Sequence, residues 1–266
     1  MGKTMTGHLR LWRNYDDWAG LRGKLIVTLL RQWVTLPGSV VLDAGCGAGG
    51  ASLALAEAGA AVTAVDLQRT PPSRIAGSPV RYVCADLATW QNDVPLQAAV
   101  LWDVLEHLAD PNRVLQQISR ALKPGGLLLV ATPNRYAPSN ALCDPHYGLP
   151  GLSLLPRRAI ARIIAGWLRW LPADKPDFPQ LLSLAAVDRL FRDSGFSWRF
   201  VNRETYYAAM RMPRALWNRP WHLHAVETLQ SYGWDRRLGQ WVDNRNSFGN
   251  RWLMPTFFIL ARKEAS

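Results

Sequence analysis

The sequence VVLDAGCGAGG at residues 40–50 constrains the fold more than any other part of the chain. A short apolar run of the kind that forms a buried strand leads into a glycine-rich turn, where Gly45, Gly47 and Gly50 have the spacing G-x-G-x-x-G. Glycines permit a tight turn and let a ligand approach the backbone at the carboxyl end of a parallel sheet. The segment therefore predicts an α/β fold with a ligand site at this turn.

Strand-like and helical patterns alternate around this turn. Apolar runs typical of strands occur at 39–45, 61–67, 80–87, 98–102 and 127–133, and helical patterns occur at 51–60 and 112–122. This alternation is typical of βαβ units with right-handed connections, in which helices cover both faces of a parallel sheet. We therefore expect a doubly wound α/β sheet.

The whole chain, residues 1–266, is interpreted as a single domain with additions to a central core. Apolar residues four apart between positions 21 and 33 predict an N-terminal helical cap over 1–37. The core that holds the glycine-rich turn spans 38–133. Two stretches rich in arginine and tryptophan, 134–178 and 205–252, are predicted to be substrate-side insertions, with a helix over 183–196 between them and a last strand at 256–263.

The acidic residues near the turn indicate which ligand it binds. Asp66 ends the next strand-like run about twenty residues later, where a carboxylate can accept both hydroxyl protons of a ribose. A dinucleotide dehydrogenase shares that feature. However, Asp43 stands where a pyrophosphate would lie, and a carboxylate repels a pyrophosphate but attracts an ammonium group. The ligand is better interpreted as a nucleoside with a cationic amino-acid tail.

Five segments in order, VLDAGCGAGG, AVTAVDLQ, CADLATW, DVLEHLADP and ALKPGGLLLVATPN, resemble the motifs of class I S-adenosylmethionine-dependent methyltransferases. The resemblance covers roughly residues 38–135, and it is strongest with the small-molecule branch that includes the ubiquinone-biosynthesis O-methyltransferases. It implies a Rossmann-like sheet, mostly parallel with an antiparallel last strand. It also implies that S-adenosyl-L-methionine is the cofactor and that a small or lipid-linked acceptor is methylated, with oxygen as the expected nucleophile.

The resemblance also assigns cofactor-binding roles to residues at the ends of the predicted strands. Asp43, Gly45 and Gly47 would line the methionine portion, and Asp66 would hold the ribose hydroxyls. Leu67, Asp86 and Leu87 would border the adenine, and Leu101 and Trp102 would pack near the methionine and the sulfonium. Alternative structural roles remain open for some of them. A helix N-cap is the alternative role for Asp86, and core packing that also borders the ligand is the alternative role for Leu67 and Leu87.

His107 is the candidate catalytic residue, because it follows the fourth strand at the rim of the site and a histidine with a pKa of about 6.5 can accept a proton at neutral pH. A second interpretation comes from the resemblance, since the matching segment of ubiquinone-type enzymes binds a divalent metal. Here Asp103, Glu106 and His107 would hold Mg²⁺ or Zn²⁺. The sequence leaves the metal open. It also leaves open whether His146 and Tyr147 approach the acceptor or only shape a loop.

The charge of the chain favours an anionic contact. Lys and Arg number 31 against 20 Asp and Glu, a formal net charge of +11, which suits nucleic acid, a phosphorylated substrate or a membrane surface, although a compositional bias explains it equally well. The segment 156–172 predicts a basic amphipathic helix, either a lid packed on the domain or an element that lies in an anionic membrane interface. Its apolar face is formed by Ile160, Ile163, Ile164, Trp167, Leu168 and Leu171.

Two alternative functions remain. A nucleic-acid methyltransferase would explain the charge. However, no RNA-binding module is recognised, so the small-molecule interpretation does not expect nucleic acid as a partner. A membrane-associated cofactor-binding protein without turnover is the other alternative. Three widely spaced cysteines, the lack of a signal-peptide pattern and the lack of an apolar run of spanning length lead us to expect a reduced, cytoplasmic protein with peripheral membrane contact as an open option.

Overall fold

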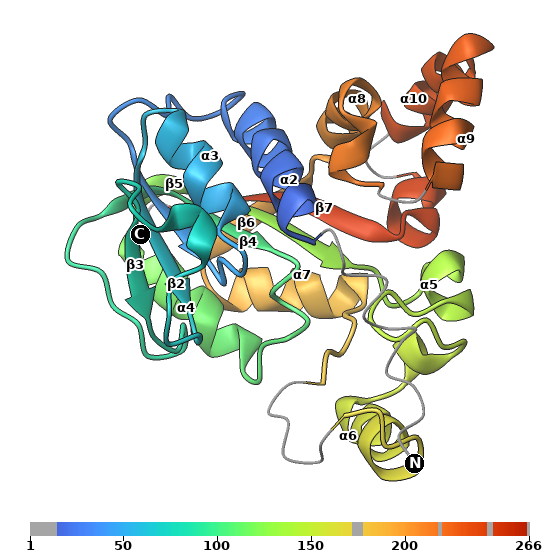
Figure 1. Cartoon of the computed structure of the whole chain (residues 1–266), viewed down its shortest axis with the longest axis horizontal. Coiled ribbons are helices and arrows are strands. Elements are labelled where there is room, and N and C mark those ends of the chain that lie inside the picture. The colour runs from blue at the N-terminus through green and yellow to red at the C-terminus, as the bar shows by residue number, and fades with distance from the viewer. Residues whose placement is uncertain (1–14, 172–177, 218–219, 244–246, 265–266) are drawn as a thin grey trace.

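A computed structural model describes residues 15–171, 178–217, 220–243 and 247–264 (Figure 1). Within these residues the chain forms a seven-stranded sheet with the strand order β3-β2-β1-β4-β5-β7-β6. The strands are β1 Val40–Ala44, β2 Ala61–Asp66, β3 Arg81–Cys84, β4 Leu96–Trp102, β5 Leu122–Pro133, β6 Phe196–Phe200 and β7 Thr256–Lys263.

The sheet is Rossmann-like. The five strands β3, β2, β1, β4 and β5 are parallel to one another, and β7 pairs antiparallel with both β5 and β6. This confirms the predicted mostly parallel sheet with an antiparallel last strand. The strand order changes direction between β1 and β4, and ligands of such sheets bind outside the carboxyl ends of the strands at that point.

Helices cover both faces of the sheet (Figure 1). One face carries α2 (Tyr15–Leu30) and α3 (Gly50–Glu57), and the other carries α4 (Pro111–Ala121) and α7 (Leu184–Asp193). A separate apolar core lies on each side. Leu25 and Leu29 of α2 are fully buried in the first core, and Leu115 of α4 and Phe191 of α7 are fully buried in the second. Burial on both faces explains why the central strands are almost continuously apolar.

The helices α2 and α3 touch backbone to backbone. A Cβ atom added at Gly23 would lie 2.1 Å from the carbonyl oxygen of Gly50, and one added at Gly50 would lie 2.1 Å from the carbonyl oxygen of Ala19. The last glycine of the G-x-G-x-x-G pattern is therefore required by this helix contact. The contact places α2 directly beside the glycine-rich turn.

The first insertion is a series of short elements, namely α5 (Pro138–Leu142), the 3₁₀ turn η2 (Leu152–Leu154), α6 (Arg157–Ala161) and the π-helical turn η3 (Arg162–Trp167). It has a small core of its own, in which Ile160 and Ile164 are buried with Tyr147, Leu152 and Phe178. The predicted continuous amphipathic helix is thus only partly correct. A π-helical turn winds more widely than an α-helix, which shifts the apolar face, and Trp167 is 79% exposed instead of packed with the isoleucines.

The second insertion is a helical group that follows β6. It comprises α8 (Asn202–Arg211), η4 (Pro213–Ala215), α9 (Pro220–Ser231), α10 (Trp234–Asp243) and the π-helical turn η5 (Gly249–Leu253). A further short turn, η1 (Ser73–Ile75), belongs to the core and lies between β2 and β3. The sequence pattern did not predict where β6 ends and α8 begins. Among the described residues no helix has the length and apolar character needed to cross a membrane.

Buried asparagines join the second insertion to the end of β5. The side-chain amide of Asn134 donates to the carbonyl oxygens of Arg251 and Met254, and that of Asn140 donates to the carbonyl oxygen of Pro255. These hydrogen bonds tie η5 to the loop that follows β5. The division of the chain into a cap, a core and two insertions stays a prediction.

Replacing Gly23 by alanine is expected to lower the free energy of unfolding by about 1–3 kcal/mol, the usual cost of an overpacked contact. The matched control is Gly166→Ala, because a Cβ at Gly166 meets no atom within 4 Å. Urea denaturation followed by circular dichroism measures both variants. An equal effect of the two substitutions would show that the contact between α2 and α3 does not require glycine at position 23.

Candidate functional site

The glycine-rich turn is held against the end of β2. The backbone N–H groups of Gly45 and Cys46 donate to the carbonyl oxygen of Val65, at 2.8 and 3.2 Å. Gly45 has a φ of 75°, and a Cβ there would lie 2.6 Å from a side-chain methyl carbon of Val104, in the segment that follows β4. The first glycine therefore lets the turn after β1 and the turn after β4 approach each other.

Asp43 lies in β1, directly before the glycine-rich turn. Its carboxylate is buried, with the residue 3% exposed, and accepts a hydrogen bond from the hydroxyl of Ser52. Burial raises the pKa of Asp43 to about 6, the hydrogen bonds from Ser52 oppose that rise, and the nearby Asp66 adds to it. The group is therefore largely ionised at neutral pH, as an ammonium ligand would require. That it binds an ammonium group stays a prediction.

Asp66 spans the turn from the end of β2. One carboxylate oxygen accepts the N–H of Gly47 at 2.8 Å, and the other accepts the N–H of Gln68 at 3.2 Å. The side chain is only half-buried, and each oxygen retains a further lone pair for a ligand hydroxyl. This geometry suits the predicted role with a ribose.

The other predicted cofactor residues differ in accessibility. Asp86 is exposed, and its carboxylate accepts the N–H of Ala88, so the alternative structural role accounts for that contact. Leu87 and Leu101 are buried in the core, whereas Leu67 is 71% exposed beside Asp66. Trp102 is half-buried and packs against the ring of Phe258 at 5.6 Å between centroids. Their contacts with a cofactor stay predictions.

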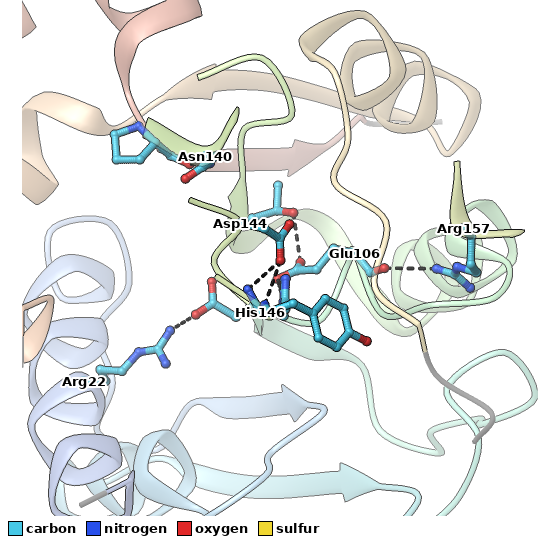
Figure 2. Close-up of polar contacts among 10 residues, drawn as sticks. Arg22, Glu106, Asn140, Asp144, His146 and Arg157 are labelled. Atoms are coloured by element: carbon cyan, nitrogen blue, oxygen red, sulfur yellow. Dashed lines mark hydrogen bonds and ion pairs between the residues drawn. The ribbon is translucent and has the colours of Figure 1, made fainter. Parts of the chain in front are cut away.

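Arg22 is a site residue that the sequence did not reveal. Its guanidinium forms an ion pair with Asp103, directly after β4 (Figure 2). The guanidinium also lies 4.2 Å from the ring centroid of Trp18. Asp103 has a φ of 53°, an uncommon backbone conformation for a residue other than glycine. A single arginine in a helix has no distinctive spacing, and its partner is 81 positions away in the sequence, so no local signal identified the pair.

Glu106 and His146 face each other at the centre of the candidate acceptor side (Figure 2). Glu106 is fully buried, one carboxylate oxygen accepts the hydroxyl of Thr132 at 2.9 Å, and the other lies 3.9 Å from Nε2 of His146. The ring of His107 packs edge-on against that of His146, with centroids 5.0 Å apart. Burial, with a smaller contribution from the nearby Asp103, raises the pKa of Glu106 to about 8, and His107 opposes this rise.

The loop of the first insertion holds His146 in this position. The carboxylate of Asp144 accepts the backbone N–H groups of His146 and Tyr147, both at 2.9 Å. Arg157 of α6 donates to the carbonyl oxygens of Glu106 and Leu108, at 3.0 and 2.8 Å. The insertion therefore fixes both His146 and the turn that contains Glu106. Of the two roles left open for His146, the structure favours an approach to the site, whereas Tyr147 is buried in the small core of the insertion.

The predicted metal-binding trio does not come together. Asp103 is turned towards Arg22 on α2, whereas Glu106 and His107 lie with His146. The potential ligand atoms of Glu106, His107 and His146 all lie within 4.8 Å of one another. Within the described part of the chain this is the group that could hold a metal ion.

Comparisons with known proteins agree with this geometry. Residues 18–199 match the family described as "Methyltransferase domain". Ubiquinone biosynthesis O-methyltransferase of Idiomarina loihiensis is 39% identical over 106 residues, which cover 37% of this chain and 44% of that protein. The Caulobacter vibrioides protein of the same name is 32% identical over 154 residues, 54% of each chain. The matches thus span about half the length of these curated relatives.

Solved structures share the fold at low sequence identity. An S-adenosylmethionine-dependent methyltransferase from Mesorhizobium loti is similar with a TM-score of 0.56 and 16% identity, over 89% of this chain and 96% of that one. The 1,6-didemethyltoxoflavin-N1-methyltransferase of Burkholderia thailandensis, solved with S-adenosylhomocysteine, has a TM-score of 0.51 and 16% identity, over 98% and 85% of the two chains.

The buried Asp43 should make the stability of the protein depend on pH. Because its pKa is raised from 3.8 to about 6, the folded protein keeps a proton that the unfolded chain releases between these values. Relative to Asp43→Asn, the wild type should therefore lose about 2–3 kcal/mol of unfolding free energy as the pH rises from about 4 to about 7. Urea unfolding at each pH measures this loss. Asp93→Asn, at an exposed position, should follow the wild type; if Asp43→Asn followed it too, the assigned shift would be wrong.

Proposed function

This chain belongs to the methyltransferase domain family, in the class I group that uses S-adenosylmethionine, and on that premise we propose that it transfers a methyl group to a small or lipid-linked acceptor, at an oxygen atom. The observation that carries this proposal is the pair of carboxylates, Asp43 and Asp66, on either side of the glycine-rich turn at the ends of β1 and β2. The family match also decides against the dinucleotide dehydrogenase that the glycine pattern alone would allow.

Complementary charges support a position for the cofactor. The ribose hydroxyls would bind the half-buried carboxylate of Asp66, and the ammonium group of the methionine portion would face Asp43 across Gly45 and Gly47. The methionine portion also carries a carboxylate, and the guanidinium of Arg22, which is paired with Asp103 directly after β4, is the cation that we assign to it. Leu67, Asp86 and Leu87 would border the adenine, with Leu101 and Trp102 near the sulfonium.

Methyl transfer from a sulfonium needs mainly alignment and an available lone pair, because the leaving group is neutral. We assign His107 to the acceptor side of the reaction, since it lies beyond β4 in contact with His146 and close to the buried Glu106. A hydroxyl acceptor would approach between this cluster and the sulfonium. Removal of the hydroxyl proton by a positioned group typically contributes about 10²–10⁴-fold to the rate.

The acceptor class is supported by two observations. The two curated relatives described above bear the name ubiquinone biosynthesis O-methyltransferase, and both insertions of this chain present large apolar side chains to solvent. These include Leu142, Trp167, Trp241, Phe248 and Trp252. Aromatic side chains beside arginines suit an apolar acceptor that is delivered from an anionic lipid surface, and peripheral contact with such a surface is part of the proposal. The net charge of +11 is the one observation that favours a nucleic-acid acceptor instead.

The cofactor assignment predicts that S-adenosylhomocysteine binds and that NAD does not. Asp66→Asn should weaken S-adenosylhomocysteine binding about 10- to 100-fold, because hydrogen bonds to a charged group contribute about 1.5–3 kcal/mol. Isothermal titration calorimetry measures both ligands, with Asp93→Asn as an exposed carboxylate control. Tight NAD binding, or an Asp66→Asn variant with unchanged affinity, would contradict the cofactor site.

The acceptor assignment predicts that His107→Ala reduces turnover about 10²-fold or more while the affinity for S-adenosylhomocysteine stays within about twofold of the wild type. Transfer of a radioactive methyl group is measured with substituted catechols, a polyprenylated phenol in vesicles and total RNA as separate acceptors. Labelling of RNA alone would support the nucleic-acid alternative. Labelling of none, with the cofactor bound, would support a cofactor-binding protein without turnover.

A further inference from the structure

We propose that Glu106, His107 and His146 form a divalent-metal site in which an imidazole from the first insertion takes the place of Asp103. The resemblance to ubiquinone-type enzymes implies ligands from one segment only, residues 103–107. In this chain the ligands come from two segments, the turn after β4 and the loop after α5. The inference concerns metal binding and holds for any acceptor class.

The buried carboxylate of Glu106 is the strongest argument. Glu106 is 0% exposed, and its Oε1 atom is buried without a hydrogen-bond partner, while Oε2 accepts the hydroxyl of Thr132. A buried carboxylate oxygen without a donor is costly. A metal ion beside Oε1 would supply the missing positive charge.

The positions of the donors suit one ion. Oε1 of Glu106 lies 3.9 Å from Nε2 of His146, and the donor atoms of all three side chains lie within 4.8 Å. Two ligands of a tetrahedral ion with bonds of about 2.1 Å are separated by about 3.4 Å. Small rotations of the side chains therefore suffice to close the site.

Asp103 is not available to this cluster. Its carboxylate is paired with Arg22 of α2, and its backbone has a positive φ of 53°. A guanidinium next to a carboxylate opposes the approach of a second cation. The donor set consequently changes from two carboxylates and one imidazole to one carboxylate and two imidazoles, which favours Zn²⁺, Mn²⁺ or Fe²⁺ over Mg²⁺.

Groups behind the ligands hold them in place, as in established metal sites. Thr132 binds Glu106, Asp144 binds the backbone of the loop that carries His146, and Arg157 binds the carbonyl oxygen of Glu106. Three protein ligands leave a coordination position for another molecule. A bound ion would supply Lewis acidity, which lowers the pKa of an acceptor hydroxyl.

The test is a metal titration of tag-free protein after treatment with a chelator. The wild type should bind one Zn²⁺ by isothermal titration calorimetry and one Mn²⁺ by electron paramagnetic resonance, with Mn²⁺ included because the exposed Cys84 and Cys143 can also attract Zn²⁺. His146→Ala and Glu106→Gln should each weaken Mn²⁺ binding about 10-fold or more. Asp103→Asn is the matched control and should stay within about threefold of the wild type.

Two further measurements separate the possible failures. Circular dichroism and S-adenosylhomocysteine binding establish that each variant is folded, and the spectrum of Co²⁺ in the wild-type protein reports nitrogen ligation without any substitution. Stoichiometric binding that depends on Asp103 and not on His146 would overturn the ligand set. No binding of Zn²⁺, Mn²⁺ or Co²⁺ to protein that binds S-adenosylhomocysteine would overturn the site and leave the proposed methyl transfer intact.

Discussion

The contact between the backbones of α2 and α3 sets the arrangement of the whole site. Because neither Gly23 nor Gly50 has a side chain, α2 lies directly on the start of α3, beside the glycine-rich turn. That position carries Arg22 to the carboxyl end of β4, where it pairs with Asp103. The N-terminal helix thereby contributes a cation to a site that also contains the carboxylates of Asp43, Asp66 and Asp103. One close helix contact thus determines both the shape and the charge balance of the cofactor side.

The ion pair of Asp103 with Arg22 also affects the charges around Glu106, on the proposed acceptor side. With its carboxylate held by Arg22, Asp103 acts on Glu106 only through space, as a negative charge that raises the pKa of the buried acid. Across the site, Nε2 of His146 lies 3.9 Å from a carboxylate oxygen of Glu106. The charge of Asp103, which is paired with Arg22 on α2, is therefore felt by the buried acid that faces His146.

The sequence predicted the parts of the fold and site that depend on local patterns. The strand predicted at 256–263 matches β7, Thr256–Lys263, and the turn after β1 lies where its glycines indicated. The ion pair of Arg22 with Asp103 and the approach of His146 to Glu106 join residues that are far apart in the sequence, and each depends on packing that no local pattern encodes. The prediction of a continuous amphipathic helix was only partly correct, for a different reason. Its periodicity assumed α-helical winding, whereas residues 162–167 form a wider π-helical turn.

The first insertion is better understood as part of the candidate site than as an addition to it. It holds the turn after β4 through Arg157, supplies His146, and packs Ile160 and Ile164 into a small core that also contains Tyr147, the neighbour of His146. Loss of that core would release His146 and the carbonyl contacts of Glu106 together. The acceptor side is therefore built by two segments that must fold onto each other, whereas the cofactor side is built by the sheet and α2. Separate construction of the two halves lets one cofactor site serve different acceptors in proteins of this fold.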